Sequence, residues 1–383
     1  MRSRIIFIAI VALLSACKQK ENRKYLPASA TAEFNYRKLS LAEEEFYRSA
    51  VHRMYDSILL KHRFNGSILV AKNGEVLLED YHGYANPLTK DSITPSTTFH
   101  LASVSKTFTG MAIMKLAEEN KLHLDDSLQT FFPNFPYQGI TVRMLLSHRS
   151  GLPNYVYFMT QDPAWRRRIA TNNDMLQYMI DKKPALYGYP NRGFHYCNTN
   201  FALLALIVEK VSGQPFPEYM KNTIFTPLGM THTFIFSKQD SANYKPSFQP
   251  NNHPFPLEPI DCIYGDKNVY STVRDMYLWD QALYSNRVVS QASYEEATKP
   301  YSLERPSIHN YGLGWRLMML PNSKIVYHNG WWHGNNTVFT RLVDDTATVI
   351  VLSNRFNKAI YAGMKIGTVF ANSKKAEPEK PLD

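Results

Sequence analysis

Strand-forming segments at both ends of the chain constrain this fold more than any other sequence feature. Residues 66–71 are apolar and β-prone, residues 76–84 alternate loosely, and Asn73-Gly74 between them is a strong hairpin signal. Four more strand-like runs lie near the other end, at residues 311–319, 324–328, 336–343 and 346–352. The section between, about 120–300, mixes helical segments with proline-containing loops. We therefore expect the two ends to close one sheet around an inserted lobe.

Helical patterns complete an α/β (α+β) fold class. Residues 41–63 carry apolar side chains at four-residue spacing, which predicts an amphipathic helix: Phe46, Ala50, Met54 and Ile58. Further helices are predicted over residues 103–116, 200–211, 272–284 and 358–370. The expected architecture is an antiparallel sheet flanked by N- and C-terminal helices, with a mostly helical lobe over about residues 106–300.

The N-terminus indicates export. Arg2 and Arg4 precede an apolar run over residues 5–14, followed by Ser15-Ala16-Cys17, which is the pattern of a secretory signal peptide over residues 1–16. The ending Leu14-Ser15-Ala16-Cys17 resembles the lipobox of bacterial lipoproteins, which implies cleavage before Cys17 and acylation of that cysteine. The alternative is an ordinary signal peptide with a chance cysteine.

The lipoprotein resemblance has consequences for location. It implies a chain anchored by lipid in the cell envelope, on the periplasmic side or at the cell surface. Residues 17–40 then form the lipidated cysteine and a polar tether, and residues 373–383, which are charged and contain prolines, are expected to be a disordered tail.

The basic charge does not indicate a nucleic-acid partner. The formal net charge is +10, but the basic residues are scattered, and the densest run, Arg166-Arg167-Arg168, is not interleaved with aromatic residues. No stretch reaches the roughly 18 apolar residues that a membrane-spanning helix needs. We therefore expect membrane contact through the N-terminal lipid alone and no binding of nucleic acid.

Ser103-Val104-Ser105-Lys106 is the first motif that carries chemistry. At a helix start, residues three apart share one face, so Lys106 can reach the Ser103 hydroxyl. A serine becomes a good nucleophile when a neighbouring base takes its proton. Lys106 can do this as a neutral amine, or it stays charged and steadies the alkoxide. The spacing alone is weak, because Ser15 and Lys18 also match it.

Two further motifs follow along the chain. Tyr196-Cys197-Asn198 lies between a turn and an apolar helix, where a phenol can face a cleft; the alternative is a buried aromatic residue with a capping asparagine. His328-Asn329-Gly330 follows an apolar strand, and its glycine permits close approach of a ligand. Taken alone, His328 has a structural role as its alternative.

Neither a metal nor a cofactor is predicted. The sequence holds no phosphate-binding loop, no His-Glu-x-x-His and no Gly-x-Ser-x-Gly elbow. His328 and His333 flank an Asn-Gly-Trp-Trp segment that we expect to form a turn, but no carboxylate accompanies them at metal-ligand spacing. Cys197 and Cys262 are expected to be free thiols.

In this order, Ser-x-x-Lys, Tyr-x-Asn and His-x-Gly resemble the serine β-lactamase-like family. That family includes class C β-lactamases, low-molecular-weight penicillin-binding proteins, D-aminopeptidases and esterases. The flanking segments at residues 99–102, 140–152 and 311–315 are similar to those of the family, and the resemblance covers roughly residues 60–355. It implies a β-lactamase/transpeptidase-like catalytic domain over residues 41–372.

The resemblance also implies roles. Ser103 would be the acylated nucleophile, and Lys106 and Tyr196 would share the proton transfers, with the general base left open between them. The backbone N–H groups of Ser103 and Trp331 would form the oxyanion hole.

Other positions would bind the substrate. Asn198 would hydrogen-bond the substrate amide, Gly330 would permit its close approach, and His328 would bind its acidic or carbonyl end. His328 replaces a lysine found in many β-lactamases and is a weaker anchor for a carboxylate. Trp331 and Trp332 suggest an aromatic wall that narrows the site. Residues 147–152 are interpreted as structural.

The resulting hypothesis is a lipid-anchored serine hydrolase that acts through an acyl-enzyme on a peptide, β-lactam or ester bond. Its partner would be a small-molecule or peptide substrate, and it would need no cofactor. The alternative is a non-catalytic or slowly deacylating binding protein of the same fold. A purely structural envelope lipoprotein would leave three ordered motifs unexplained.

Overall fold

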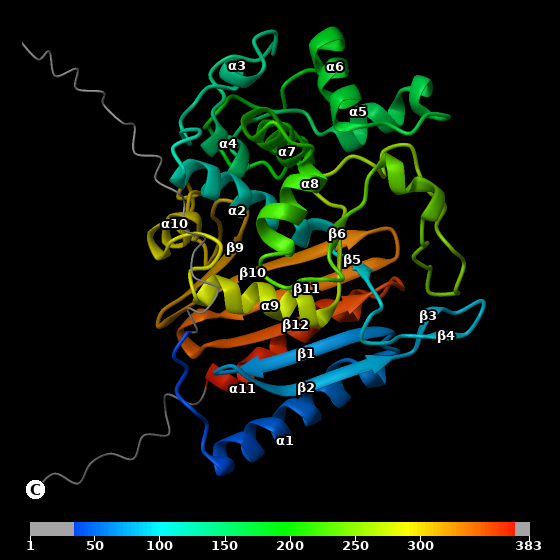
Figure 1. The fold of residues 1–383 in the computed structure, drawn as a ribbon, viewed down its shortest axis with the longest axis vertical. Helices are drawn as coiled ribbons and strands as arrows, with labels where there is room; N and C mark the ends of the chain where they lie inside the picture. Colours follow the sequence, from blue (N-terminus) through cyan, green and yellow to red (C-terminus); the bar gives the residue numbers. More distant parts are fainter. Residues whose placement is uncertain (1–33, 372–383) are drawn as a thin grey trace, which may run out of the picture.

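One antiparallel sheet of seven strands forms the centre of the molecule (Figure 1). The structure is a computed structural model that describes residues 34–371. The strand order is β2-β1-β12-β11-β10-β9-β8. The strands are β1 Gly66–Lys72, β2 Glu75–His82, β8 His309–Tyr311, β9 Arg316–Leu320, β10 Ser323–Trp332, β11 Asn335–Leu342 and β12 Ala347–Ser353. Because β1 pairs with β12, with Gly66 opposite Ser353, the two ends of the chain close the sheet as predicted.

The predicted hairpin connects β1 and β2. Asn73 has φ 49° and Gly74 has φ 80°, so both residues occupy the left-handed region. Two such residues make the type I′ turn whose twist matches that of the flanking strands. The Asn-Gly signal in the sequence therefore located this turn correctly.

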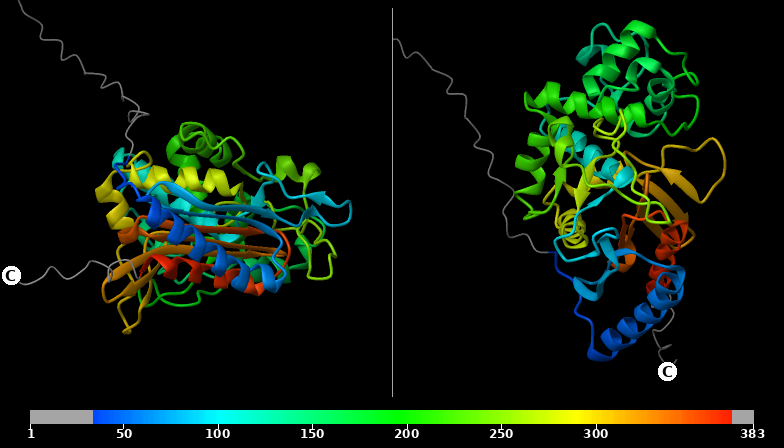
Figure 2. Two further views of the ribbon diagram at one scale, coloured as in Figure 1. Left: turned by 90° about the horizontal axis from the view of Figure 1, so that it is seen from below. Right: turned by 90° about the vertical axis from the view of Figure 1, so that its right-hand side faces the viewer.

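Helices from both ends of the chain cover one face of the sheet (Figures 1 and 2). They are α1 (Leu41–Ile58), the 3₁₀ segment η7 (Lys358–Gly367) and α11 (Thr368–Ala371). η7 was predicted as part of an α-helix. Its Gly363 packs so close to β12 that an added Cβ would lie 3.0 Å from the Val351 side chain.

The buried face of α1 differs by one residue from the prediction. Tyr47, Val51 and Tyr55 are buried, whereas Phe46 is 60% exposed. The Tyr55 hydroxyl donates to Asp80 on β2 across this interface. The four-residue spacing showed that the helix is amphipathic, but packing against the sheet decides which of two neighbouring apolar rows is buried.

A helical lobe covers the other face of the sheet (Figures 1 and 2). Its longest helices are α2 (Ser105–Glu118), α7 (Asn198–Ser212) and α9 (Val273–Tyr284). The shorter ones are α3 Leu128–Phe131, α4 Val142–Leu146, α5 Tyr155–Gln161, α6 Asn172–Lys182, α8 Phe216–Met220 and α10 Gln291–Ala297. α2 and α7 are buried along most of their length, and their side chains join the lobe and the sheet in one hydrophobic core.

Two small sheets and several short turns connect these layers. β5 (Phe99–His100), β7 (Val269–Ser271) and β6 (Phe234–Ile235) pair side by side, and β3 (Tyr84–Asn86) pairs with β4 (Asp91–Ser92). The remaining short helical segments are the 3₁₀ segments η1 Leu60–His62, η2 Ala102–Val104, η3 Pro163–Trp165, η5 Lys238–Asn243 and η6 Val343–Asp345, and the π-helical segment η4 Lys221–Phe225. The pairing of β5 with β7 brings the chain before Ser103 next to residues 265–269.

The packed domain begins before residue 41. The Phe34 ring lies 5.4 Å from that of Tyr284, and the Asn73 side chain donates to the Arg37 carbonyl at 2.9 Å. Part of the expected tether is thus packed on the domain. The expected signal peptide, Cys17 and the expected tail at 373–383 lie outside the described residues. Between residues 34 and 371, no helix has the length and apolar character needed to cross a membrane.

Candidate active site

Ser103 and Lys106 are in hydrogen-bond contact where η2 passes into α2. The Lys106 Nζ donates to Ser103 Oγ at 3.1 Å and to the Asp266 carbonyl at 2.7 Å. Lys106 is fully buried and Ser103 is partly exposed. Ala102, directly before the serine, has φ 49°, an unfavourable region for a residue with a Cβ. The strained turn places the hydroxyl over the first turn of α2, as the three-residue spacing predicted.

Residues 265–269 hold this end of α2 in place, and no sequence motif indicated them. The Gly265 carbonyl accepts from Thr109 Oγ1 at 2.7 Å, and the Val269 N–H donates to Ser105 Oγ at 3.0 Å. Together with the Asp266 carbonyl, these contacts fix the Lys106 side chain from both sides. Gly265 has φ 97°, and an added Cβ would lie 2.4 Å from the Phe201 carbonyl, so glycine is required there.

A buried charged network supports the same segment. The Tyr155 hydroxyl donates to the Asp266 carboxylate at 2.9 Å, and the Lys267 ammonium donates to Tyr155 and to the Ile263 carbonyl. Burial lowers the pKa of Lys267, while the neighbouring Asp266 and Asp261 carboxylates oppose that shift. The Asp266 and Lys267 side chains are both almost fully buried.

Tyr196 and Asn198 bring two unsatisfied polar groups to the site. Lys106 Nζ lies 5.0 Å from the centre of the Tyr196 ring. Asn198 is the first residue of α7. The Tyr196 hydroxyl and the Asn198 Oδ1 are both buried, and neither has a hydrogen-bond partner within residues 34–371. Buried polar groups are normally hydrogen-bonded. The Tyr196 hydroxyl and the Asn198 Oδ1 are therefore candidates for a hydrogen bond to a ligand.

His148 positions Tyr196, a role that the sequence indicated only as part of a structural segment. The two rings lie 4.3 Å apart, and His148 Nδ1 accepts from the Cys197 N–H at 3.1 Å. Burial lowers the pKa of His148 well below its ordinary value, so the ring is neutral. Cys197 is buried beside the Leu152 carbonyl, and burial raises the pKa of its thiol to about 11, which makes it a poor nucleophile. Cys197 and Cys262 are both free thiols, as expected.

The third motif lies inside β10. Asn329-Gly330-Trp331-Trp332 is strand, and the turn comes at His333-Gly334, so the expected turn was misplaced. An added Cβ on Gly330 would lie 2.3 Å from the Leu101 carbonyl, so only glycine lets β10 approach η2 this closely. β9 pairs with β10 no further than Tyr327. The edge of β10 beyond that point therefore meets the turn that carries Ser103.

His328 is buried and paired with protein groups, in a different environment from the open site that the sequence suggested. It is fully buried, its Nδ1 lies 2.8 Å from the Asn329 carbonyl, and its Nε2 lies 3.1 Å from the Tyr311 hydroxyl. Burial, with the nearby Arg316 and Lys106 charges, lowers the pKa of His328 well below its ordinary value. Both ring nitrogens are engaged and the ring is uncharged, so His328 has no free donor for a substrate carboxylate.

The two tryptophans do not form a joint wall. Side chains alternate along a strand, so neighbouring residues point to opposite faces. Trp331 is 62% exposed and its ring lies 5.9 Å from Phe356, whereas the Trp332 Nε1 donates to Asp261 at 2.9 Å. Trp332 shares the face of Gly330. Only its ring can narrow the site, and Trp331 contributes at most its backbone.

Arg316 joins the site without any sequence signal. It is the first residue of β9 and pairs with Tyr327, directly before the third motif. Its guanidinium carbon lies 5.1 Å from the centre of the Tyr196 ring. Within residues 34–371, the Arg316 side chain forms no hydrogen bond and no ion pair.

His333 has carboxylate neighbours that the sequence did not reveal. Its Nε2 lies 3.1 Å from both oxygens of Asp261, and Glu258 places a third ligand atom within 4.8 Å. The Asp261 carboxylate also accepts from Trp332 Nε1 and from the Glu258 N–H at 2.7 Å. The Asp261 carboxylate is thus hydrogen-bonded by protein groups. These contacts hold the β10–β11 turn against the loop before Asp266.

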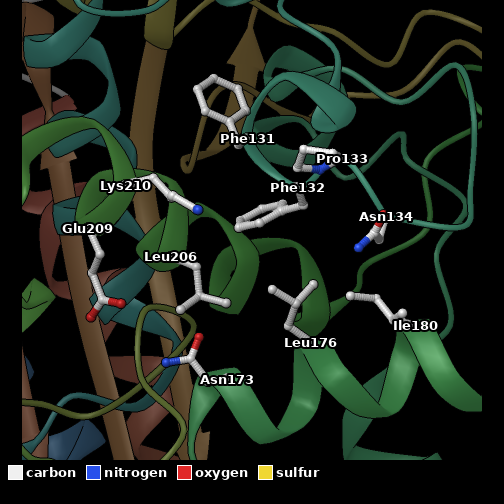
Figure 3. Close-up of a pocket in the computed structure, with 10 residues that line it drawn as sticks. All are labelled: Phe131, Phe132, Pro133, Asn134, Asn173, Leu176, Ile180, Leu206, Glu209 and Lys210. Carbon is white, nitrogen blue, oxygen red and sulfur yellow. The ribbon is translucent and has the colours of Figure 1, made fainter.

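A separate cavity of about 400 Å³ lies in the helical lobe (Figure 3). The side chains of Phe132, Leu176 and Leu206 point toward it, and Lys210 also lines it. Its lining shares no residue with the Ser103 cluster and includes no serine, cysteine or histidine. It therefore offers no nucleophile for the chemistry considered above.

Comparison with known proteins agrees with this geometry. A family model described as Beta-lactamase matches residues 54–366. A penicillin-binding protein of Bacillus subtilis (strain 168) is 36% identical over 327 residues, which are 80% of this chain and 72% of that protein.

Solved structures share the fold. The octameric penicillin-binding protein homologue from Pyrococcus abyssi is 25% identical, with a TM-score of 0.72 over 84% of this chain and 77% of that chain. The D-amino acid amidase from Ochrobactrum anthropi SV3 is 22% identical, with a TM-score of 0.70 over 86% and 98% of the two chains. The fold class predicted from the sequence is thereby confirmed.

Proposed function

Since the chain belongs to the Beta-lactamase family, we propose that it is a serine hydrolase that works through an acyl-enzyme on Ser103. The observation that carries this proposal is the 3.1 Å contact between Lys106 Nζ and Ser103 Oγ, with the lysine fully buried. A serine hydroxyl in hydrogen-bond contact with a buried lysine is the arrangement of a nucleophile whose proton can be passed on.

The reaction has two steps. Ser103 Oγ attacks the substrate carbonyl carbon while its proton passes to the Lys106–Tyr196 pair, and the N–H groups of Ser103 and Trp331 receive the developing oxyanion. Collapse breaks the bond to the leaving group, which takes up the proton. Water then attacks the Ser103 ester, and the acid product leaves with the serine hydroxyl restored.

The unpartnered Asn198 oxygen favours a substrate that carries an amide N–H beside the scissile carbonyl. Asn198 Oδ1 is buried and lacks a donor among the described residues. A peptide or a penicillin supplies such a donor, whereas a simple ester does not. The similarity to a penicillin-binding protein supports the same class.

The location is part of the proposal and depends on sequence alone. A chain cleaved before Cys17 and acylated on that cysteine would be held in the cell envelope. Cys17→Ser, expressed in a bacterial host, should lose incorporation of radiolabelled palmitate and leave the membrane fraction. Undiminished incorporation in the variant would contradict lipidation at this residue.

The hydrolase proposal is tested by covalent labelling. Residues 18–383 are incubated with a fluorescent penicillin and with a fluorophosphonate, and intact mass is followed over time. We expect a Ser103-dependent adduct that is absent in Ser103→Ala and kept in Cys197→Ala. Labelling that survives Ser103→Ala, or no adduct from either probe, would contradict the proposal.

A further inference from the structure

One peptide group of the site is held by a side chain that belongs to none of the three motifs. The proposed oxyanion donor at the third motif is the Trp331 N–H, and the carbonyl of the same peptide is that of Gly330. The hydroxyl of Tyr361, within η7, donates to this Gly330 carbonyl at 3.1 Å. η7 covers the face of the sheet opposite to the helical lobe, so the contact reaches the peptide from the side away from Ser103.

The direction of this hydrogen bond follows from two asparagines. The Asn357 N–H donates to Asn336 Oδ1 at 2.7 Å, so the nitrogen end of the Asn336 side chain faces Tyr361. That Nδ2 donates to the Tyr361 oxygen at 2.9 Å, and an amide nitrogen does not accept. Burial raises the pKa of Tyr361, which keeps its hydroxyl protonated. The phenolic proton is therefore left for the Gly330 carbonyl.

The N–H of this peptide lies at an edge that no neighbouring strand holds. The carbonyl and the N–H of a trans peptide point in opposite directions, so the Trp331 N–H points away from Tyr361. β9 pairs with β10 no further than Tyr327, and no other described strand takes its place beside Trp331. Tyr361 thus constrains, from the carbonyl end, a peptide whose N–H end is open to the site.

β11 connects both halves of the proposed oxyanion hole. The Thr337 hydroxyl donates to the Leu101 carbonyl at 2.8 Å, which holds the turn that carries Ser103. The preceding residue, Asn336, contacts Tyr361 on the opposite face, because neighbouring residues of a strand point to opposite sides. Two adjacent residues of one strand therefore fix, from its two faces, the supports of the two N–H donors.

We propose that Tyr361 is a positioning residue that acts through the Gly330–Trp331 peptide, holding and polarising the N–H that receives the oxyanion. A hydrogen bond to the carbonyl of a peptide makes the N–H of that peptide a stronger donor. It also fixes the plane of the peptide, so the donor needs no reorganisation as the oxyanion forms. The gain arises where charge develops on the substrate oxygen, in the transition state. This inference deepens the proposed function and depends on it.

The first test measures acylation of residues 18–383 by an N-acyl amino acid nitrophenyl ester. Ser103 Oγ bonds to the ester carbonyl carbon and nitrophenolate leaves, so its release in the first turnover reports the acylation rate. Tyr361→Phe keeps the ring and removes the hydroxyl. It should lower the rate at saturation by roughly tenfold and keep the half-saturating concentration within about twofold of wild type. A raised half-saturating concentration at an unchanged rate would overturn the inference.

A sulfur-substituted substrate separates this role from a merely structural one. In the matching thiono ester, sulfur replaces the carbonyl oxygen and accepts hydrogen bonds only weakly. Tyr361→Phe should therefore slow acylation by the oxygen ester more than acylation by the thiono ester. The ratio of the two rates should fall by about fivefold or more relative to wild type. An equal loss on both esters would show that Tyr361 acts only on the fold, and would overturn the inference.

Tyr277→Phe is the matched control. The Tyr277 hydroxyl on α9 also donates to a backbone carbonyl, that of Gly74, at 2.7 Å, and both tyrosines are partly buried. This contact lies at the turn between β1 and β2, outside the site. Tyr277→Phe should leave the acylation rate and the ratio of the oxygen and thiono esters unchanged. The same change of ratio in both variants would overturn the inference.

The inference and the proposed function fail in different ways. If the wild-type protein releases no nitrophenolate, or if Ser103→Ala releases it at the wild-type rate, the proposed function is overturned. If wild-type release depends on Ser103 and Tyr361→Phe acylates at the wild-type rate, only the inference about Tyr361 is overturned.

Discussion

At the scale of single residues, the site is defined by polar atoms that the fold leaves without partners. Most buried polar groups in a folded protein are hydrogen-bonded, and each exception needs a reason. The Tyr196 hydroxyl, the Asn198 oxygen and His148 Nε2 are three such exceptions, and the rings of Tyr196 and His148 lie 4.3 Å apart. Together with the Ser103–Lys106 contact, they indicate a site that is completed by a ligand.

Asn198 gives a direct residue-scale prediction. Its Oδ1 should accept from the substrate amide, so Asn198→Ala should lower kcat/KM by roughly tenfold, the effect of one lost hydrogen bond. The measurement compares a peptide substrate with its N-methylated analogue, which cannot donate. The wild-type preference for the N–H substrate should disappear in the variant. An equal loss on both substrates would show that Asn198 acts on the fold.

Contacts between site residues were predictable from the sequence where spacing along one element sets the geometry. Ser103 and Lys106 lie three residues apart on one turn, and this alone fixes their contact. Arg316, Asp266 and His148 were not predictable as site residues, because each reaches the site by packing of segments distant in sequence. The environment of His328 was misjudged for the same reason, since Tyr311 comes from another strand.

At the scale of elements, α9 is held to the sheet by a buried ion pair. Arg341 on β11 donates to Asp280 Oδ1 on α9 at 2.5 Å and also contacts the Tyr294 hydroxyl. Both side chains of the ion pair are almost fully buried. Removing one charge of such a pair leaves the other uncompensated in a poor solvent for ions.

Arg341→Met should therefore lower the free energy of unfolding by about 3–5 kcal/mol, measured by urea titration. The exposed pair of Arg37 and Glu43 serves as the control. Arg37→Gln should lower the free energy of unfolding by less than about 1 kcal/mol. Similar effects for the two variants would contradict the view that α9 depends on this pair.

Elements were predictable where local sequence decides them. The Asn73-Gly74 turn and the strands β1, β11 and β12 follow from turn chemistry and β-prone runs, which act within a few residues. The buried row of α1, the 3₁₀ character of η7 and the end of β10 depend on what packs against them. We expected a turn at Trp331 and Trp332. They are part of β10 instead, because they pair with β11, and the turn comes two residues later.

At the scale of the whole molecule, three buried neutral histidines tie stability to pH. Burial lowers the pKa of His100 to about 4 and those of His148 and His328 well below the ordinary value. In the unfolded chain each would titrate near pH 6.5. Below that pH the unfolded state binds more protons than the native state, so stability falls as pH falls.

The free energy of unfolding should therefore be lower at pH 5.0 than at pH 7.5, with His100 alone contributing about 2 kcal/mol of the difference. Urea titrations at the two pH values check this. In His100→Gln the difference between the two pH values should shrink by about 2 kcal/mol. Equal stability at both values would show that these histidines are not neutral in the native state.

The overall architecture was predictable because the two ends of the chain carry the strands and the middle carries the helices. A sheet that closes through its terminal strands places the lobe on one face and leaves the Ser103 turn against the edge of β10. The site lies between parts of the chain that are more than 200 residues apart. Their meeting could not be predicted from the sequence and is known only from the structure.

The most direct measurement is the position of the acyl group. Wild-type protein is quenched in acid after reaction with a fluorescent penicillin, digested with trypsin, and mapped by fragmentation mass spectrometry. The account predicts the adduct on Ser103, within the peptide 91–106. An adduct on Ser105, or on Cys197 in the peptide 193–210, would contradict it.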